Sequence, residues 1–182
     1  MKFFVRLFYK TFVKFAYKIG QIKAELEFDI NYLNYQRNKR KGYWERKLKK
    51  IGSNSHIYPN VIIHVPNMVS LGERVNIAEY VHMWGGGGIE IGDNVIIASH
   101  TVITSQTHSK NANLYRESSV MKAVKIGNNC WIGSGAIIFP GVEIGDNSII
   151  GAQTVVTRNV PANSVFLGVP GNVIETLKNK NE

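Results

Sequence analysis

Aliphatic residues recur every six positions along much of this chain, between residues 71 and 161. The leading positions of the repeat are Leu71, Ile77, Met83, Ile91, Ile97, Ile103, Ile126, Ile132, Ile138, Ile144, Ile150 and Val156. This period fits neither the helical repeat of about 3.6 residues nor the two-residue alternation of a sandwich strand. It is typical of a parallel β-helix, in which each hexad forms one flat side and about 18 residues complete a coil. We therefore expect a mainly β fold with the leading aliphatic residues stacked inside.

Two breaks interrupt this register. The first adds two residues around Trp84 and the glycine run 85–88. The second adds 17 residues after Ile103, and these must leave the coil as an external loop, expected over 109–125. His108 stands where this loop departs. Long loops on a rigid scaffold often carry function, so this break marks the first place to look for a site.

The chain divides into two parts by composition. Residues 1–50 hold 14 Lys and Arg against 4 Asp and Glu, whereas the remaining residues hold 8 against 9. We expect residues 1–50 to form a basic helical segment and residues 51–182 to form the β-helix domain. The irregular hexads at 51–70 predict a first, capping coil, and the C-terminal tail is expected to end in a short helix at 173–178.

The first helix, over residues 2–19, is predicted to be amphipathic. Cations and aromatic residues each recur at every fourth position on opposite sides: Lys2, Arg6, Lys10, Lys14 and Lys18 against Phe4, Phe8 and Phe12. Such a helix can bind an anionic membrane surface, or its aromatic face can pack against a neighbouring subunit or the end of the β-helix. Nucleic acid is not an expected partner, because the cations and aromatic rings do not interleave.

Cellular context follows from two further features. The single cysteine, Cys130, falls at an inward repeat position, which excludes an intrachain disulfide and fits a reducing compartment. No run of about 18 apolar residues is present, so no helix is expected to span a membrane. These features indicate a cytoplasmic protein, either free or peripheral at the inner membrane face.

The repeats, the loop and the tail together carry a family resemblance. The segments IGDNVIIASHTVITSQTH at 91–108, IGNNCWIGSG at 126–135 and LGVPGNVI at 167–174 resemble the hexapeptide-repeat acyltransferases. Within that family the chain is most similar to the maltose, galactoside and xenobiotic O-acetyltransferases. The resemblance implies a left-handed parallel β-helix, a homotrimer with active sites between subunits, and acetyl-CoA as co-substrate.

The same resemblance assigns catalytic and cofactor-binding residues. His108 lies 17 positions after Ile91, where the family places its catalytic histidine. A neutral imidazole suits the removal of a proton from a sugar hydroxyl near pH 7. Five positions match the family's coenzyme A contacts: Gly133 and Ser134 near the thioester, Ala152 along the pantetheine arm, and Thr157 and Arg158 near the adenine and its phosphate. Asn172 and Thr176 depart from the pattern, because relatives often carry Arg there.

The acceptor side differs from the family. Ala78 and the glycines at 85–86 stand where maltose and galactoside relatives carry acceptor-binding Asn and Asp, so a simple maltose or galactoside acceptor is not expected. We assign His82, Trp84 and Trp131 to acceptor binding, with Trp84 as a stacking surface for a sugar. The glycines either leave room for a bulky acceptor or form a plain bulged corner.

These features favour an acetyl-CoA-dependent O-acetyltransferase acting on a saccharide, such as a cell-surface glycan or its precursor. Three alternatives stay open. The first is N-acetyl transfer to an amino sugar, and the second is a non-catalytic trimeric scaffold. The third is a zinc-dependent hydratase of the carbonic anhydrase type, because His64, His82 and His100 are 18 positions apart. No metal ligands are assigned in the favoured reading.

Overall fold

A computed structural model of the chain describes residues 15, 17–24, 34 and 37–177. The chain forms two compact units, Met1–Lys39 and Arg40–Glu182. In the first unit, residues 17–24 are helical. Most of the helix expected over 2–19, and with it the expected membrane contact, lies outside the described residues. Among the described residues, no helix is long and apolar enough to cross a membrane.

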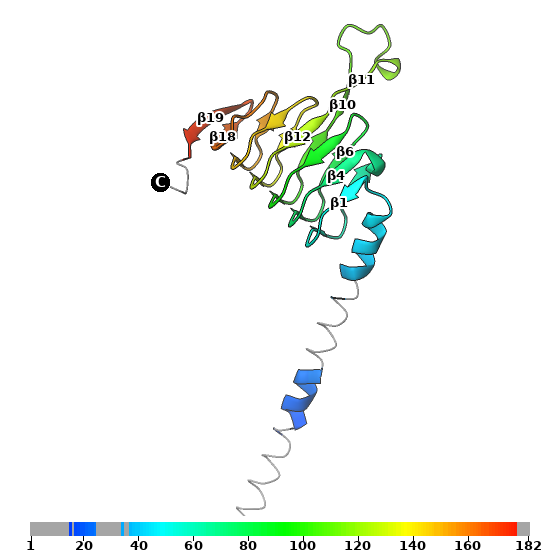
Figure 1. Cartoon of the computed structure of the whole chain (residues 1–182), viewed down its shortest axis with the longest axis vertical. Coiled ribbons are helices and arrows are strands. Elements are labelled where there is room, and N and C mark those ends of the chain that lie inside the picture. The colour runs from blue at the N-terminus through cyan, green and yellow to red at the C-terminus, as the bar shows by residue number, and fades with distance from the viewer. Residues whose placement is uncertain (1–14, 16, 25–33, 35–36, 178–182) are drawn as a thin grey trace, which may run out of the picture. The chain divides into compact units, whose positions relative to one another are not determined.

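The second unit is a parallel β-helix preceded by helical residues 40–45, and Figure 1 shows its coils stacked side by side. Its strands are β1 Lys50–Ile51, β2 His56–Ile57, β3 Ile62–His64, β4 Val69–Leu71, β5 Asn76–Ile77, β6 His82–Trp84, β7 Ile89–Ile91, β8 Ile96–Ile97, β9 Val102–Thr104, β10 Gln106–His108, β11 Ser119–Met121, β12 Val124–Ile126, β13 Trp131–Ile132, β14 Ile137–Ile138, β15 Glu143–Ile144, β16 Ile149–Ile150, β17 Val155–Val156, β18 Ser164–Gly168 and β19 Gly171–Thr176. Short 3-10 turns lie at Pro66–Met68 and Tyr115–Glu117.

Three flat sheets enclose the core. We call them face A (β1-β4-β7-β12-β15), face B (β2-β5-β8-β13-β16-β18-β19) and face C (β3-β6-β9-β14-β17). The chain turns from one face to the next at three edges, which we name A/B, B/C and C/A after the faces that they join. Strands of successive coils pair in parallel, as expected for a β-helix.

The predicted inward positions form the core. All twelve leading aliphatic residues of the hexad repeat are buried, with 4 % or less of their surface exposed. Cys130 is also buried, and its burial raises the pKa of the thiol, so the side chain acts as a small core residue. The hydrophobic period read from the sequence is therefore the packing period of the fold.

The length of the first coils differs from the expectation. Ile62, His82 and Val102 occupy one register on face C and are 20 residues apart, whereas Ile137 and Val155 are 18 apart. The two additional residues of each early coil lie at the C/A edge. The insertion expected near Trp84 is confirmed, but the preceding coil carries one at the same edge. An 18-residue count therefore misplaces side chains in this part of the molecule.

The external loop begins as a β-hairpin. Strands β10 and β11 pair antiparallel, with His108 opposite Ser119, and Figure 1 shows them projecting from the coils. The hairpin is anchored where it leaves the C/A edge: the Lys122 N–H donates to the Ser105 carbonyl at 2.9 Å, and the Gly87 N–H donates to Ser105 Oγ at 2.9 Å. The excursion thus starts before residue 109, and His108 is carried outward on a strand.

The expectation of a helix at 173–178 is wrong. Residues 171–176 form strand β19, which pairs antiparallel with β18 and ends face B. Val173, Ile174 and Thr176 are β-branched and fit a pleated strand better than a helix. Opposite Val173, Phe166 is buried against the last coil. The tail therefore closes the β-helix as a hairpin.

Gly87 tests the packing of the C/A edge. A Cβ atom at Gly87 would lie 2.3 Å from the Ser105 carbonyl oxygen, a backbone atom that the hairpin root holds in place. We expect Gly87→Ala to lower the free energy of unfolding by about 1–3 kcal/mol, the usual range for overpacking. Gly42→Ala is the control, because Gly42 is helical and its nearest neighbour would lie at 3.7 Å. Urea denaturation should show no loss for Gly42→Ala, and equal effects of the two substitutions would contradict the packing account.

Candidate active site

The cofactor positions read from the sequence fall on two edges of one face. Gly133, Ser134 and Ala152 lie in successive coils at the B/C edge, where the Gln153 N–H donates to the Ser134 carbonyl at 2.8 Å. A Cβ atom at Gly133 would lie 2.6 Å from the Ala152 nitrogen, so the close approach of the two coils requires glycine at this position. Ser134 and Ala152 are exposed. The result is a shelf of small residues on which a ligand can approach the backbone.

The same shelf presents unused hydrogen-bond donors. Within the described part of the chain, the N–H groups of Ser134 and Ala152 donate to no protein acceptor. Each belongs to the turn between faces B and C, where one amide per coil points away from the strand ladder. Backbone N–H groups arranged in this way can bind a carbonyl oxygen or stabilise an oxyanion.

Thr157 and Arg158 lie at the other end of face C, on the C/A edge. Arg158 Nη2 donates to the Gly171 carbonyl at 3.0 Å and also contacts Asn172 Oδ1. The C-terminal hairpin therefore orients the Arg158 guanidinium. The remaining N–H groups of the guanidinium are available for an anion, because five donors are present in this side chain. Asn172, one of the positions that depart from the family pattern, is thus a partner of Arg158.

His108 shares the C/A edge with this pair. It ends strand β10 and is exposed, as are the neighbouring residues Thr107 and Lys110. Ser105 anchors the strand to the coil below by donating its N–H to the Trp84 carbonyl at 2.9 Å. An exposed imidazole on a strand with a fixed root can reach a substrate that lies beside the β-helix.

Face C carries stacked aromatic rings near its N-terminal end. The His64 and Trp84 ring centroids are 4.1 Å apart and the His82 and Trp84 centroids 5.2 Å, both in stacked geometry. His82 Nε2 is buried without a hydrogen-bond partner. Burial, followed by the nearby His64, lowers the pKa of His82, so its imidazole is held in the neutral form.

A second ring pair escaped the sequence analysis. Tyr80 and His100 stack at the B/C edge with centroids 5.1 Å apart, and both have a left-handed backbone, with φ of 62° and 63°. Bulky residues seldom adopt this conformation. The signal was present in their spacing of 20 residues, which equals the distance from Leu71 to Ile91 across the first break of the repeat.

Trp131 lies apart from the other acceptor residues. It stands on face B, in register with Ile96 and Ile149, and is exposed. His82 and Trp84 are on face C. Within one chain, the structure does not bring Trp131 together with them.

The glycine run 85–88 is a packed corner. A Cβ atom at Gly85 would lie 2.7 Å from Val69 Cγ2, and one at Gly86 would lie 2.4 Å from Gln106 Oε1. Space above these glycines is filled by the preceding coil and the hairpin root. Of the two interpretations of the glycines, the structure therefore favours the bulged corner over room for a bulky acceptor.

The three histidines spaced 18 apart do not form a metal-binding row. His64 pairs in register with Trp84, His82 with Val102, and His100 stacks on Tyr80 at the edge. Among the described residues, no group of three His, Cys, Asp or Glu side chains is arranged to hold a metal ion. The geometry that motivated the hydratase alternative is therefore absent from these residues.

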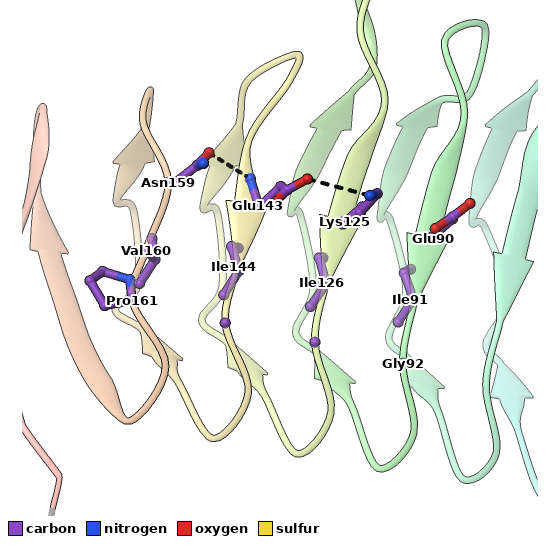
Figure 2. A pocket seen from close by; sticks show the side chains of 12 residues that line it. Glu90, Ile91, Gly92, Lys125, Ile126, Glu143, Ile144, Asn159, Val160 and Pro161 are labelled. Carbon is purple, nitrogen blue, oxygen red and sulfur yellow. Dashed lines mark hydrogen bonds and ion pairs between the residues drawn. The ribbon is translucent and has the colours of Figure 1, made fainter.

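A groove on face A contains none of the assigned site residues. It has a volume of about 600 Å³ and is lined by outward side chains of successive coils, including Glu90, Lys125, Glu143 and Asn159. As Figure 2 shows, Lys125 Nζ lies 3.4 Å from Glu143 Oε1, and the Glu143 N–H donates to Asn159 Oδ1. Of the charged groups in this groove, Lys125 and Glu143 thus pair with each other.

The outward residues of the three faces differ in chemistry. On face A the register column reads Ser70, Glu90, Lys125 and Glu143. On face B it reads His56, Asn76, Ile96, Trp131, Ile149 and Val165. On face C two columns read Ile62, His82, Val102, Ile137 and Val155, and His64, Trp84 and Thr104. In these columns faces B and C carry no acidic or basic group other than histidine, except that Glu175 of β19 stands opposite Val165 at the C-terminal end of face B.

Comparison with known proteins places these features in a family. Residues 123–158 match the family described as bacterial transferase hexapeptide (six repeats). The chain is 32 % identical over 145 residues to a galactoside O-acetyltransferase of Escherichia coli (strain K12), covering 79 % of this chain and 71 % of the relative. It is 31 % identical over 125 residues to a putative colanic acid biosynthesis acetyltransferase of the same organism, covering 69 % and 68 %.

Solved structures agree with the sequence relatives. A galactoside acetyltransferase in complex with coenzyme A has a TM-score of 0.75 at 32 % identity, with 78 % of this chain and 71 % of that chain covered. A hexapeptide-repeat acetyltransferase of Vibrio cholerae in complex with acetyl coenzyme A has a TM-score of 0.75 at 27 % identity, with 78 % of each chain covered. The chain belongs to the hexapeptide-repeat acetyltransferases.

Proposed function

We propose that this enzyme transfers an acetyl group from acetyl-CoA to a hydroxyl of a saccharide. Its relatives are named for galactoside O-acetylation and for colanic acid and lipopolysaccharide biosynthesis. Solved neighbours hold coenzyme A or acetyl coenzyme A. The observation that carries the proposal is the exposed His108 at the end of β10, on a strand anchored at the edge of an acetyltransferase scaffold.

The chemistry requires a base and an electrophile. In the proposed reaction His108 takes the proton of the acceptor hydroxyl. At the same time the hydroxyl oxygen of the acceptor attacks the thioester carbonyl carbon. The carbon–sulfur bond then breaks, the acetyl group remains on the sugar oxygen, and the thiolate of coenzyme A receives the proton from His108. Transfer to oxygen is favoured over transfer to an amino sugar because a galactoside relative and a maltose relative, each about one-third identical to this chain, are named O-acetyltransferases.

The shelf at the B/C edge suits the thioester end of acetyl-CoA. The free Ser134 N–H is placed to stabilise the negative charge that develops on the carbonyl oxygen. Gly133 and Ala152 let the pantetheine arm approach the backbone. At the C/A edge, Thr157 and Arg158 suit the adenine and its phosphate, for which a guanidinium is a good partner.

The active site needs more than one copy of the chain. In the coil that contains β14, Ser134 and Phe139 lie at the two ends of face C. Five residues of extended chain separate them by about 17 Å. The hairpin that carries His108 leaves from the far end, so one chain does not join the two halves of the site. A cyclic trimer places the C/A edge of one subunit beside the B/C edge of the next. The apolar columns of faces B and C supply the surface for such contacts.

His108 gives the first functional prediction. His108→Ala should lower turnover by about 10²–10⁴-fold, because a positioned general base contributes that much, and should leave coenzyme A affinity nearly unchanged. Release of the coenzyme A thiol from acetyl-CoA with neutral oligosaccharide acceptors measures turnover. Lys110→Ala, in the same exposed loop, is the control and should keep wild-type turnover. A His108→Ala enzyme with full turnover would assign the base to another group.

The shared site gives a prediction about assembly. Light scattering of the wild type should give a mass about three times 20.4 kDa. Ile96→Asp places a charge on exposed face B and should yield monomers with little transferase activity, because a buried unpaired carboxylate is unfavourable. Ser70→Asp makes the matched change on charged face A and should keep both trimer and activity. A wild-type monomer with full activity would refute the shared site.

A further inference from the structure

Five aromatic side chains lie in two stacked groups along face C. Tyr80, His82 and Trp84 are successive outward-facing residues of a single coil. The buried residues Val81 and Met83 lie between them. His64 from the preceding coil stacks on Trp84, and His100 from the following coil stacks on Tyr80. We call these five residues the aromatic band. It runs from the B/C edge to the C/A edge over at most about 13 Å, the length of four strand residues.

The band differs from the buried core. Its members are partly or largely exposed; Tyr80 has 55 % and Trp84 36 % of its surface accessible. Each ring has an apolar face and a polar edge: a hydroxyl, an indole N–H or an imidazole nitrogen. The outward register columns of face C hold no Asp, Glu, Lys or Arg. This combination suits a ligand with apolar C–H faces and many hydroxyl groups, and it offers nothing to a charged one.

Each end of the band leads to one of the two shared active sites in which the chain takes part. At the C/A end, the Trp84 carbonyl accepts the N–H of Ser105, three residues before His108. At the B/C end, the turn of His100 continues into the acetyl shelf, where the Gly135 N–H donates to the Ser99 carbonyl at 3.0 Å. A ligand at the C/A end of the band therefore lies beside the hairpin that carries His108, and in the proposed trimer the shelf that completes this site belongs to the next subunit.

A second copy of the chain is a poorer occupant of the band. The apolar part of face B, from Ile96 to Val165, belongs to the later coils. At the level of the first two coils, face B presents His56 and Asn76. In the proposed trimer a neighbouring copy would thus set polar side chains opposite the band, which leaves a groove with one aromatic wall and one polar wall. Ligand sites in proteins are typically lined by apolar and aromatic side chains together with a small number of polar groups that orient the ligand.

We propose that the aromatic band binds an uncharged oligosaccharide segment of the acceptor by ring stacking, next to the hydroxyl that is acetylated. This inference rests on the proposed function and adds the class of acceptor: a neutral glycan of more than one sugar unit. A single sugar would cover only part of the band. The residues that recognise it are Tyr80 and Trp84, with His64, His82 and His100 supporting their rings.

Binding without acetyl-CoA tests this proposal separately from the chemistry. Isothermal titration calorimetry of the full chain is run with glucose and with the neutral trisaccharides maltotriose, cellotriose and N-acetylated chitotriose, and with trigalacturonate as the charged probe. At least one neutral trisaccharide should bind ten times or more as tightly as glucose or trigalacturonate. Because no acetyl-CoA is present, failure of His108 as the base would leave this result intact. Lys110→Ala, in the same exposed loop, should bind the trisaccharide like the wild type.

Substitutions locate the binding surface. Trp84→Ala and Tyr80→Ala should each weaken the trisaccharide about tenfold or more, whereas Trp84→Phe should keep most of the affinity because the ring remains. Tyr43→Ala, which removes an exposed aromatic residue from the N-terminal helical turn, should have no effect. Light scattering and thermal unfolding check that each variant stays folded and trimeric. The proposal is overturned if no neutral trisaccharide binds, if Trp84→Ala binds like the wild type, or if Trp84→Ala dissociates the trimer.

Discussion

The distance between neighbouring coils is the constraint on which this structure depends. Parallel strands lie about 4.8 Å apart, so the turns between faces must stack at the same spacing. At the A/B edge this leaves no room for side chains between coils. A Cβ atom would lie within 2.3–2.6 Å of the next coil at each glycine of the column, namely Gly52, Gly72, Gly92, Gly127 and Gly145. The repeated glycine of the sequence is therefore a consequence of strand spacing.

The acidic and amide residues beside these glycines complete the edge. Asp93 Oδ1 accepts the Glu73 N–H, Asn128 Oδ1 accepts the Asp93 N–H, and Asp146 Oδ1 accepts the Asn128 N–H, each at 2.7–2.8 Å. Each of these residues satisfies a backbone donor of the preceding coil that the sheet ladder leaves free. The A/B edge is thus closed by its own hydrogen bonds, and sequence repeats such as IGDN are the mark of this closure.

The other two edges hold the proposed site residues, and they are not closed in this way. The early coils gain residues at the C/A edge, and the hairpin with His108 leaves from the same edge one coil later. The B/C edge has small residues at Gly133, Ser134 and Ala152 and keeps amide N–H groups free. Face C joins the two edges and bears the aromatic band. A rigid scaffold thus separates a structural edge from two edges that are available to ligands.

The sequence was sufficient for the fold and for the positions of most candidate residues. The six-residue period identified the core, and the second break located the hairpin with His108. The sequence was not sufficient to tell which residues of successive coils lie opposite one another. The insertion near Trp84 is visible in the repeat, but the one in the preceding coil lies among irregular hexads and is not. His64 and His82 are therefore 18 positions apart without sharing a register position, because His64 pairs with Trp84.

Two other errors have simple physical origins. The tail was read as a helix because a short segment with few apolar positions carries little periodic signal. The neighbouring strand β18 lies in the same tail, and its backbone pairing with residues 171–176 stabilises them as a strand. The acceptor assignment from the sequence places Trp131 together with Trp84. Only the coil-by-coil assignment of faces shows that the two indoles point in different directions.

The account's central claim is that transfer occurs between two copies of the chain, with His108 of one and the B/C shelf of the next. A crystal structure of the full chain with coenzyme A measures this directly. We predict a trimer in which the thiol lies against Ser134 and Ala152, with the His108 imidazole of a neighbouring subunit on the open side of the sulfur. Coenzyme A bound within the groove of face A, or a thiol enclosed by a single chain, would contradict it.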